Sequence, residues 1–192
     1  MSESIVVTGF GPFKGHPINA SWENVKLLPK YWKNSNVKLI IDEIPVCYEF
    51  IQKQITAKWQ DSNPTFFVHV GVSHLATAVT LETLAHNKIY DKPDIENKCP
   101  HRQCCVTEDC PDELFTMLDL EKIVKDLKGD QVTISTDPGR YLCDFVYYKS
   151  LHCSKGRSLF IHVPVLNKPF SEHELAQILS DVLQCICEQI SQ

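Results

Sequence analysis

The chain has 192 residues, of which 43% are hydrophobic and 22% are charged, a composition that suits one globular domain over residues 1–192 with a substantial core. The formal net charge is −5 and the basic residues are scattered, which argues against a nucleic-acid partner because no basic face is available to neutralise phosphates. No apolar run reaches the roughly 18–20 residues of a membrane span, so no membrane partner is expected.

The N-terminus indicates a cytoplasmic protein. Met1-Ser2-Glu3-Ser4 leads directly into the apolar run Ile5-Val6-Val7, without the basic segment and the small-residue cleavage site of a secretory signal. The nine cysteines are an odd number, and in a reducing compartment they should be thiols rather than a disulfide framework.

Strand-like and helical segments alternate along the chain. The strand-like runs, several of them continuously apolar, are Ser4–Thr8, Val37–Ile44, Thr65–Val72, Thr77–Thr83, Gln131–Ser135 and Ser158–Val163. Helical patterns lie near Ala20–Tyr31, Tyr48–Trp59, Leu118–Leu127, Asp144–Cys153 and Glu172–Ile190, the last of which begins with a capping box at Ser171 and Glu174. This alternation predicts an α/β sandwich around a mostly parallel or mixed sheet, with a long loop from about Asn87 to Asp112 where the periodicity fails.

The first predicted strand runs into a glycine-rich turn, Gly9-Phe10-Gly11-Pro12-Phe13. A dinucleotide-binding loop would need a G-x-G-x-x-G pattern that opens a helix, and Pro12 and Phe13 break that pattern. Two phenylalanines on a tight turn are suited to an apolar slot for a small flat group, although both could equally be core residues.

The segment Ser135-Thr136-Asp137-Pro138-Gly139-Arg140-Tyr141-Leu142-Cys143-Asp144 connects a predicted strand to a predicted helix. The Pro-Gly pair predicts a sharp turn, in which Gly139 can adopt a positive φ. Cys143 would then lie near a helix N-terminus, where the backbone N–H groups and the helix dipole favour a thiolate. Cys143 is therefore a candidate nucleophile.

A cysteine nucleophile needs a base and a group that orients the base. His162 is the best candidate base, because it lies near the end of a buried strand and just before Pro164. Judged by itself, His162 is better interpreted as a core histidine. His69, one strand earlier, is interpreted as structural. Glu82 is a charged residue in an apolar run, so it either faces solvent at a strand edge or orients a histidine.

Taken together, these segments resemble the pyroglutamyl-peptidase I family of cysteine peptidases, in its animal-type form. The matching motifs run in the same order through nearly the whole chain: Val7–Phe13, Asn19–Trp22, Glu43–Val46, His69–Ser73, Val79–Glu82, His86–Lys88, Gly139–Cys143 and His162–Pro164.

The resemblance implies a three-layer α/β/α sandwich around a mixed, mostly parallel sheet, with no metal and no cofactor. The family's catalytic glutamate, cysteine and histidine correspond to Glu82, Cys143 and His162. The aromatic lining of its pyroglutamyl pocket corresponds to Phe10 and Phe13. Val72 stands where bacterial members have a glutamine near the ring and animal members share the valine. The implied substrates are small peptides with an N-terminal pyroglutamyl residue, and the implied location is the cytoplasm.

Two other hypotheses remain open at this point. Pro138 and His74 depart from residues that are common in the family, so the chain could be a weakly active or inactive paralogue that binds pyroglutamyl peptides without efficient turnover. The segment Cys99–Cys110, with four cysteines and His101, could also hold a structural zinc, although its cysteine spacing is long for a zinc site.

Overall fold

A mixed six-stranded sheet forms the centre of the molecule. The computed structural model describes residues 3–13, 15, 17–105, 109–127 and 129–191. The sheet has the strand order β2 (Lys38–Ile44), β1 (Ser4–Phe10), β3 (Phe66–Val72), β8 (Ser158–Val163), β4 (Val79–Glu82) and β7 (Val132–Ser135). Four of the five strand pairs are parallel, and β4 runs antiparallel to β8. A separate two-stranded sheet pairs β5 (Leu84–His86) with β6 (Glu113–Phe115).

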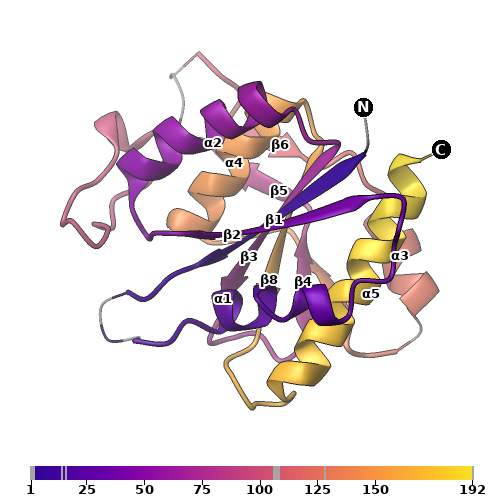
Figure 1. Cartoon of the computed structure of the whole chain (residues 1–192). Helices are drawn as coiled ribbons and strands as arrows, with labels where there is room; N and C mark the ends of the chain where they lie inside the picture. Colours follow the sequence, from indigo (N-terminus) through magenta and orange to yellow (C-terminus); the bar gives the residue numbers. More distant parts are fainter. Residues whose placement is uncertain (1–2, 14, 16, 106–108, 128, 192) are drawn as a thin grey trace.

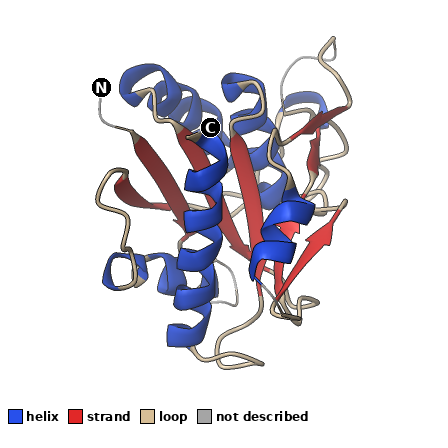
Figure 2. Cartoon of the chain, turned by 90° about the vertical axis from the view of Figure 1, so that its right-hand side faces the viewer, coloured by secondary structure: helices blue, strands red, loops and turns tan. Residues whose placement is uncertain are grey.

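Helices cover both faces of the six-stranded sheet, which makes three layers (Figures 1 and 2). The helices α1 (Ala20–Val25), α3 (Leu120–Leu127) and α5 (Glu172–Ile190) cover one face, and α2 (Tyr48–Ser62) and α4 (Leu142–Ser154) cover the other. Alternate residues of β3 serve the two cores: Val68 packs with α5 and Phe67 packs with α2 and α4. The predicted three-layer α/β/α sandwich around a mixed, mostly parallel sheet is confirmed.

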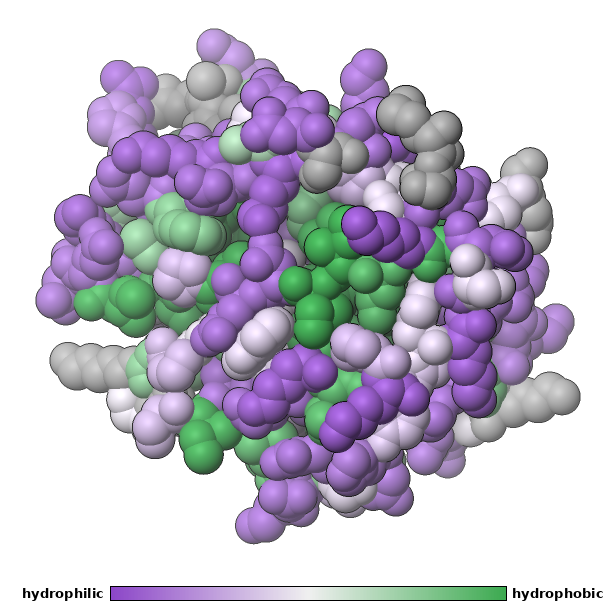
Figure 3. Space-filling view, in the orientation of Figure 1, coloured by the Kyte–Doolittle hydropathy of each residue, from purple (hydrophilic) through white to green (hydrophobic). Residues whose placement is uncertain are grey.

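The edge strand β2 carries both hydrophobic and charged residues. In the space-filling view, hydrophobic residues gather near the middle of the face, in front of β1 and β2, and polar residues surround them (Figure 3). Residues 39–41 of β2 are half-buried, while Asp42 forms an ion pair with Lys58 of α2. Charges at the ends of an edge strand discourage pairing with another sheet.

The chain direction brings several strand ends to one edge of the sheet. Because β1, β3 and β8 are parallel, Phe10, Val72 and His162 all lie at or near their carboxyl ends. Since α4 ends at Ser154, just before β8 begins at Ser158, α4 runs antiparallel to β8 and its N-terminus lies near the same edge. This edge therefore collects residues from four elements, as is usual for functional sites in α/β proteins.

Most predicted elements are present, with differences that have local causes. The first helix ends at Val25 and is followed by a 3-10 turn, Leu28–Lys30, because Pro29 cannot donate a helical hydrogen bond. The last helix has the predicted capping box, in which the Ser171 hydroxyl accepts from the Glu174 N–H. The strands β5 and β6 were not predicted, because a three-residue strand has too few positions to show a period.

Candidate active site

Cys143 lies in the first turn of α4, which begins two residues earlier than the sequence pattern predicted. The preceding turn is closed by the Gly139 N–H, which donates to Oδ1 of Asp137 at 3.0 Å, and Gly139 has a φ of +84° that glycine adopts without strain. Tyr141 is the N-cap residue, and its side chain makes no capping hydrogen bond. The N–H groups of the first helical turn therefore remain available to an anion near Cys143.

His162 and Glu82 meet on one face of the antiparallel pair of β4 and β8. The register pairs Glu82 with Phe160 and Thr80 with His162, so Glu82 and His162 are diagonal neighbours. Nδ1 of His162 lies 2.7 Å from Oε1 of Glu82. The two residues are only 8% and 2% exposed, which excludes the solvent-facing alternative for Glu82. A carboxylate this deeply buried needs a partner, and His162 provides one.

Cys143 reaches this pair from the helix above the sheet. Burial by itself lowers the pKa of His162, but hydrogen bonds to Cys143 and Glu82, together with the charges of both groups, outweigh burial and raise the pKa above its ordinary value of 6.5. The imidazole is therefore biased toward its protonated form. A cysteine beside a histidine that can hold its proton is the arrangement that a thiol nucleophile requires.

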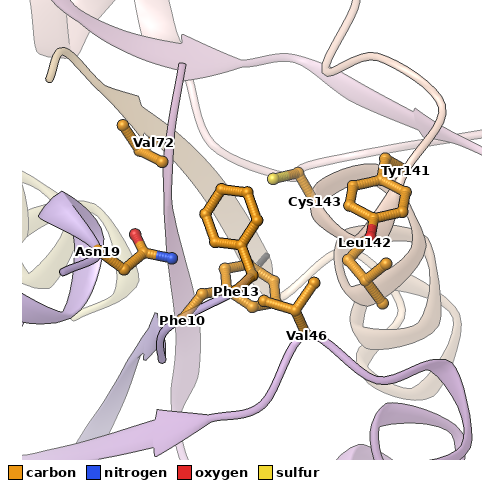
Figure 4. A pocket seen from close by; sticks show the side chains of 8 residues that line it. All are labelled: Phe10, Phe13, Asn19, Val46, Val72, Tyr141, Leu142 and Cys143. Atoms are coloured by element: carbon orange, nitrogen blue, oxygen red, sulfur yellow. The ribbon is translucent and has the colours of Figure 1, made fainter. Parts of the chain in front are cut away.

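A small cavity of about 80 Å³ opens beside Cys143 (Figure 4). Its lining is mainly apolar and consists of Phe10, Phe13, Asn19, Val46, Val72, Tyr141, Leu142 and Cys143. All three residues that the sequence indicated for substrate binding are among them, and the sulfur of Cys143 points into the same space as the ring of Phe13. The cavity is suited to one compact, uncharged group.

Four of these lining residues were not predicted. Asn19 stabilises the turn that carries the two phenylalanines, because its Nδ2 donates to the Gly11 carbonyl at 3.0 Å while its Oδ1 accepts from the Ser21 N–H at 3.1 Å. An asparagine before a helical run is a recognisable N-cap signal. Val46, Tyr141 and Leu142 belong to motifs that match the family, but no local pattern assigned them to a cavity, since they meet only through the tertiary structure.

Comparison with known proteins identifies the family. The profile of the family described as pyroglutamyl peptidase matches residues 3–189. The human protein Pyroglutamyl-peptidase 1 is 44% identical, over 99% of this chain and 92% of its own length. The chain belongs to the pyroglutamyl-peptidase family. This confirms the resemblance and the expected class of enzyme, a cysteine peptidase of the pyroglutamyl-peptidase type.

Two further proteins show how this chain compares with other members of the pyroglutamyl-peptidase family. The human Pyroglutamyl-peptidase 1-like protein is 34% identical, over 80% of this chain and 79% of its own length. A solved structure of a mutant pyrrolidone carboxyl peptidase from Pyrococcus furiosus superimposes with a TM-score of 0.86 at 27% identity, covering 97% of this chain and 99% of the other. The chain is thus more similar to human Pyroglutamyl-peptidase 1 than to the human 1-like protein.

The two departures from the pyroglutamyl-peptidase pattern fit the structure. Pro138 is buried and stands directly before Gly139, the Pro-Gly order of a type II turn, in which the second residue needs no N–H donor. His74 is exposed and is not among the residues that line the cavity. Neither residue disturbs Cys143, His162 or Glu82, so the structure does not favour the alternative of an inactive paralogue.

The other histidine of the central strands has a different environment. Nδ1 of His69 lies 2.7 Å from the Thr8 hydroxyl on the neighbouring strand, and the residue is fully buried. Burial lowers the pKa of His69 to about 3, so the imidazole is neutral at physiological pH. These contacts agree with a structural role for His69 in the pyroglutamyl-peptidase fold.

The cysteine-rich loop provides no zinc site in the part of the chain that the structure describes. Cys105 is buried and donates to the Phe145 carbonyl at 3.2 Å, whereas Cys110 lies 3.7 Å from Nε2 of His152. Among the described residues, no group of three or more histidine, cysteine or acidic side chains could hold a metal ion, and residues 106–108 of this loop lie outside that description.

The described part of the chain also contains no helix that is both long and apolar enough to span a bilayer.

Proposed function

We propose that this pyroglutamyl-peptidase family member hydrolyses the peptide bond after an N-terminal pyroglutamyl residue, with Cys143 as nucleophile, His162 as general base and acid, and Glu82 as the group that orients His162. The observation that carries the proposal is the arrangement at one sheet edge: the cavity of Phe10 and Phe13 opens onto the sulfur of Cys143, which lies beside the buried His162–Glu82 pair.

The acylation step uses all three side chains. His162 takes the proton of the Cys143 thiol, and the thiolate attacks the pyroglutamyl carbonyl carbon to form a tetrahedral intermediate. The free N–H groups at the start of α4 stabilise the negative oxygen of this intermediate. His162 then gives its proton to the departing amine, the C–N bond breaks, and a thioester to Cys143 remains.

In deacylation, water is the nucleophile and the Cys143 sulfur is the leaving group. His162 takes a proton from water, the resulting hydroxide attacks the thioester carbonyl, and the C–S bond breaks to release pyroglutamic acid. Glu82 holds the imidazole through Nδ1, so that Nε2 is the nitrogen that exchanges protons with Cys143, water and the leaving amine.

Specificity follows from the charge of the substrate terminus. A pyroglutamyl residue ends in an uncharged lactam ring, whereas an ordinary N-terminal residue ends in an ammonium group. The cavity is lined by Phe10, Phe13, Val46, Val72 and other mainly apolar residues, and none of its described lining residues is a carboxylate that could compensate that ammonium. Desolvation of the ammonium therefore excludes ordinary N-termini. The substrates are peptides that begin with pyroglutamate, and nine free thiols suit a cytoplasmic enzyme.

The test of this function is an assay with two fluorogenic substrates, a pyroglutamyl amide and a prolyl amide. We expect turnover of the pyroglutamyl amide and none of the prolyl amide, whose ring is the same size but carries a charge.

Phe13→Ala should raise KM for the pyroglutamyl amide about 10- to 100-fold, because the pyroglutamyl ring loses an aromatic contact surface. Phe50→Ala is the matched control, since Phe50 is also half-buried against the same core but does not line the cavity. Equal KM values for Phe13→Ala and wild type would contradict the proposed ring site.

Glu82→Gln should change the pH dependence as well as the rate. The charge of Glu82 helps to raise the pKa of His162, so its removal lowers that pKa, and the imidazolium form is lost at a lower pH. We expect kcat/KM to fall about 10²-fold and its alkaline limb to move to lower pH. The measurement is a pH–rate profile, with Glu121→Gln as a control because Glu121 is exposed on α3, across the sheet. An unchanged alkaline limb would contradict the role of Glu82.

A further inference from the structure

Gly71 lies on β3 directly beneath the candidate nucleophile. A methyl carbon built at Gly71 would be 2.9 Å from Sγ of Cys143 and 2.6 Å from Cζ of Phe160. Both distances are far inside the separation of about 3.5–4.0 Å at which nonbonded carbon atoms rest. The thiol therefore occupies the space that a side chain at position 71 would fill.

The backbone does not require glycine at this position. Gly71 lies inside a regular strand, and it is not among the glycines with positive φ, which are Gly15, Gly129, Gly139 and Gly156. In contrast to Gly139, any residue could adopt its backbone conformation. The need for glycine arises from the close approach of the sulfur and the Phe160 ring, not from backbone strain.

The strand register places Gly71 beside His162, the proposed base. Gly71 pairs with His162 in the parallel pair of β3 and β8, so the two residues are neighbours across the strands. Cys143, which approaches from α4, can therefore lie against the β3 backbone and beside His162. A side chain at position 71 would push the sulfur away from this location.

We propose that Gly71 is a positioning residue, and that its missing side chain sets the distance between the Cys143 sulfur and the His162 imidazole. The inference rests on the proposed role of Cys143 as nucleophile. Gly71 is not among the residues that line the ring cavity, so its effect belongs to the chemical step and not to binding of the pyroglutamyl ring.

The test begins with Gly71→Ala in the pyroglutamyl amide assay. A displacement of the sulfur by up to about 1 Å is expected to reduce kcat about 10- to 100-fold, with KM within about twofold of wild type. A wild-type kcat would overturn the proposal, and so would a loss of activity that comes entirely from a raised KM.

A second variant separates the thiol contact from the contact with the Phe160 ring. Leucine lacks the outer ring carbon that the new methyl group would meet, so Gly71→Ala combined with Phe160→Leu relieves that clash and leaves the clash with Sγ. We expect the double variant to have a kcat at least about tenfold below that of Phe160→Leu alone. Equal kcat values for these two proteins would mean that Gly71 only accommodates Phe160, and the proposal would fail.

A readout without substrate keeps this test independent of the peptidase assay. The rate of Cys143 alkylation by iodoacetamide at neutral pH, followed by mass spectrometry of the peptide that contains it, reports the reactivity of this one thiol among nine. In Gly71→Ala the sulfur lies farther from the His162 imidazole, so its alkylation should be slower than in wild type. If wild type fails to cleave the amide but alkylation slows in Gly71→Ala, the proposed function is wrong and the positioning role holds. An unchanged alkylation rate in a turnover-competent enzyme would instead refute the role of Gly71 alone.

Discussion

Cys143→Ala is expected to lower kcat for a pyroglutamyl amide by about 10⁴-fold or more, because the proposed mechanism passes through a thioester that the variant cannot form. Alanine removes one sulfur atom at a half-buried position, so the thermal unfolding midpoint should change little. The measurement is kcat and KM with the fluorogenic amide, together with thermal unfolding followed by circular dichroism.

The matched control for this variant is Cys153→Ala. Cys153 lies on the same helix, is also half-buried, and contacts the Thr56 hydroxyl at 3.8 Å. Its replacement should leave kcat within about twofold of wild type, as for a substitution outside the site. Substantial turnover by Cys143→Ala, or an equal loss in both variants, would show that the nucleophile lies elsewhere.

His162→Ala is expected to reduce kcat/KM by about 10³-fold or more, because in the proposed mechanism one imidazole serves as base for the thiol and as acid for the leaving amine. The substitution also leaves the Glu82 carboxylate buried without its partner, which should lower stability. Activity must therefore be measured at a temperature where circular dichroism shows the variant to be fully folded.

Alkylation of Cys143 gives an independent measure of what His162 does. If His162 activates the thiol, alkylation of Cys143 at neutral pH should be slower in His162→Ala than in wild type. His152→Asn is the control, since His152 is exposed near the other end of α4. If His162→Ala alkylates as fast as wild type at every pH, His162 does not activate the thiol.

The candidate site depends on an irregularity in the sheet. In an all-parallel sheet, the carboxyl end of every strand would lie at the same edge. Here β4 runs antiparallel to β8, so Glu82, at the end of its own strand, lies opposite Phe160, in the middle of β8. Its side chain then reaches back along the shared face to Nδ1 of His162, within the low-dielectric interior where the hydrogen bond is strongest.

Local patterns in the sequence predicted the parts of the molecule whose causes are local. The continuous apolar runs correspond to strands covered on both faces, as in Phe66–Val72. The Pro138-Gly139 turn predicted a helix start near Cys143, and the capping box predicted the start of the last helix at Glu172. The motif order also predicted the family, because those residues recur in a recognisable sequence of segments.

Only the tertiary structure decided how these parts meet. Glu82 and His162 are 80 residues apart, and nothing near either residue specifies that β8 inserts between β3 and β4. That strand order results from the packing of complete strands and helices. It places Glu82 next to His162, so two residues whose roles were ambiguous in the sequence form one buried pair. The same packing joined Asn19, Val46 and Tyr141 to the predicted phenylalanines, and it brought the sulfur of Cys143 against the bare backbone of Gly71. Sequence alone thus determined which side chains were available for chemistry, and long-range packing determined which of them are close enough to act together.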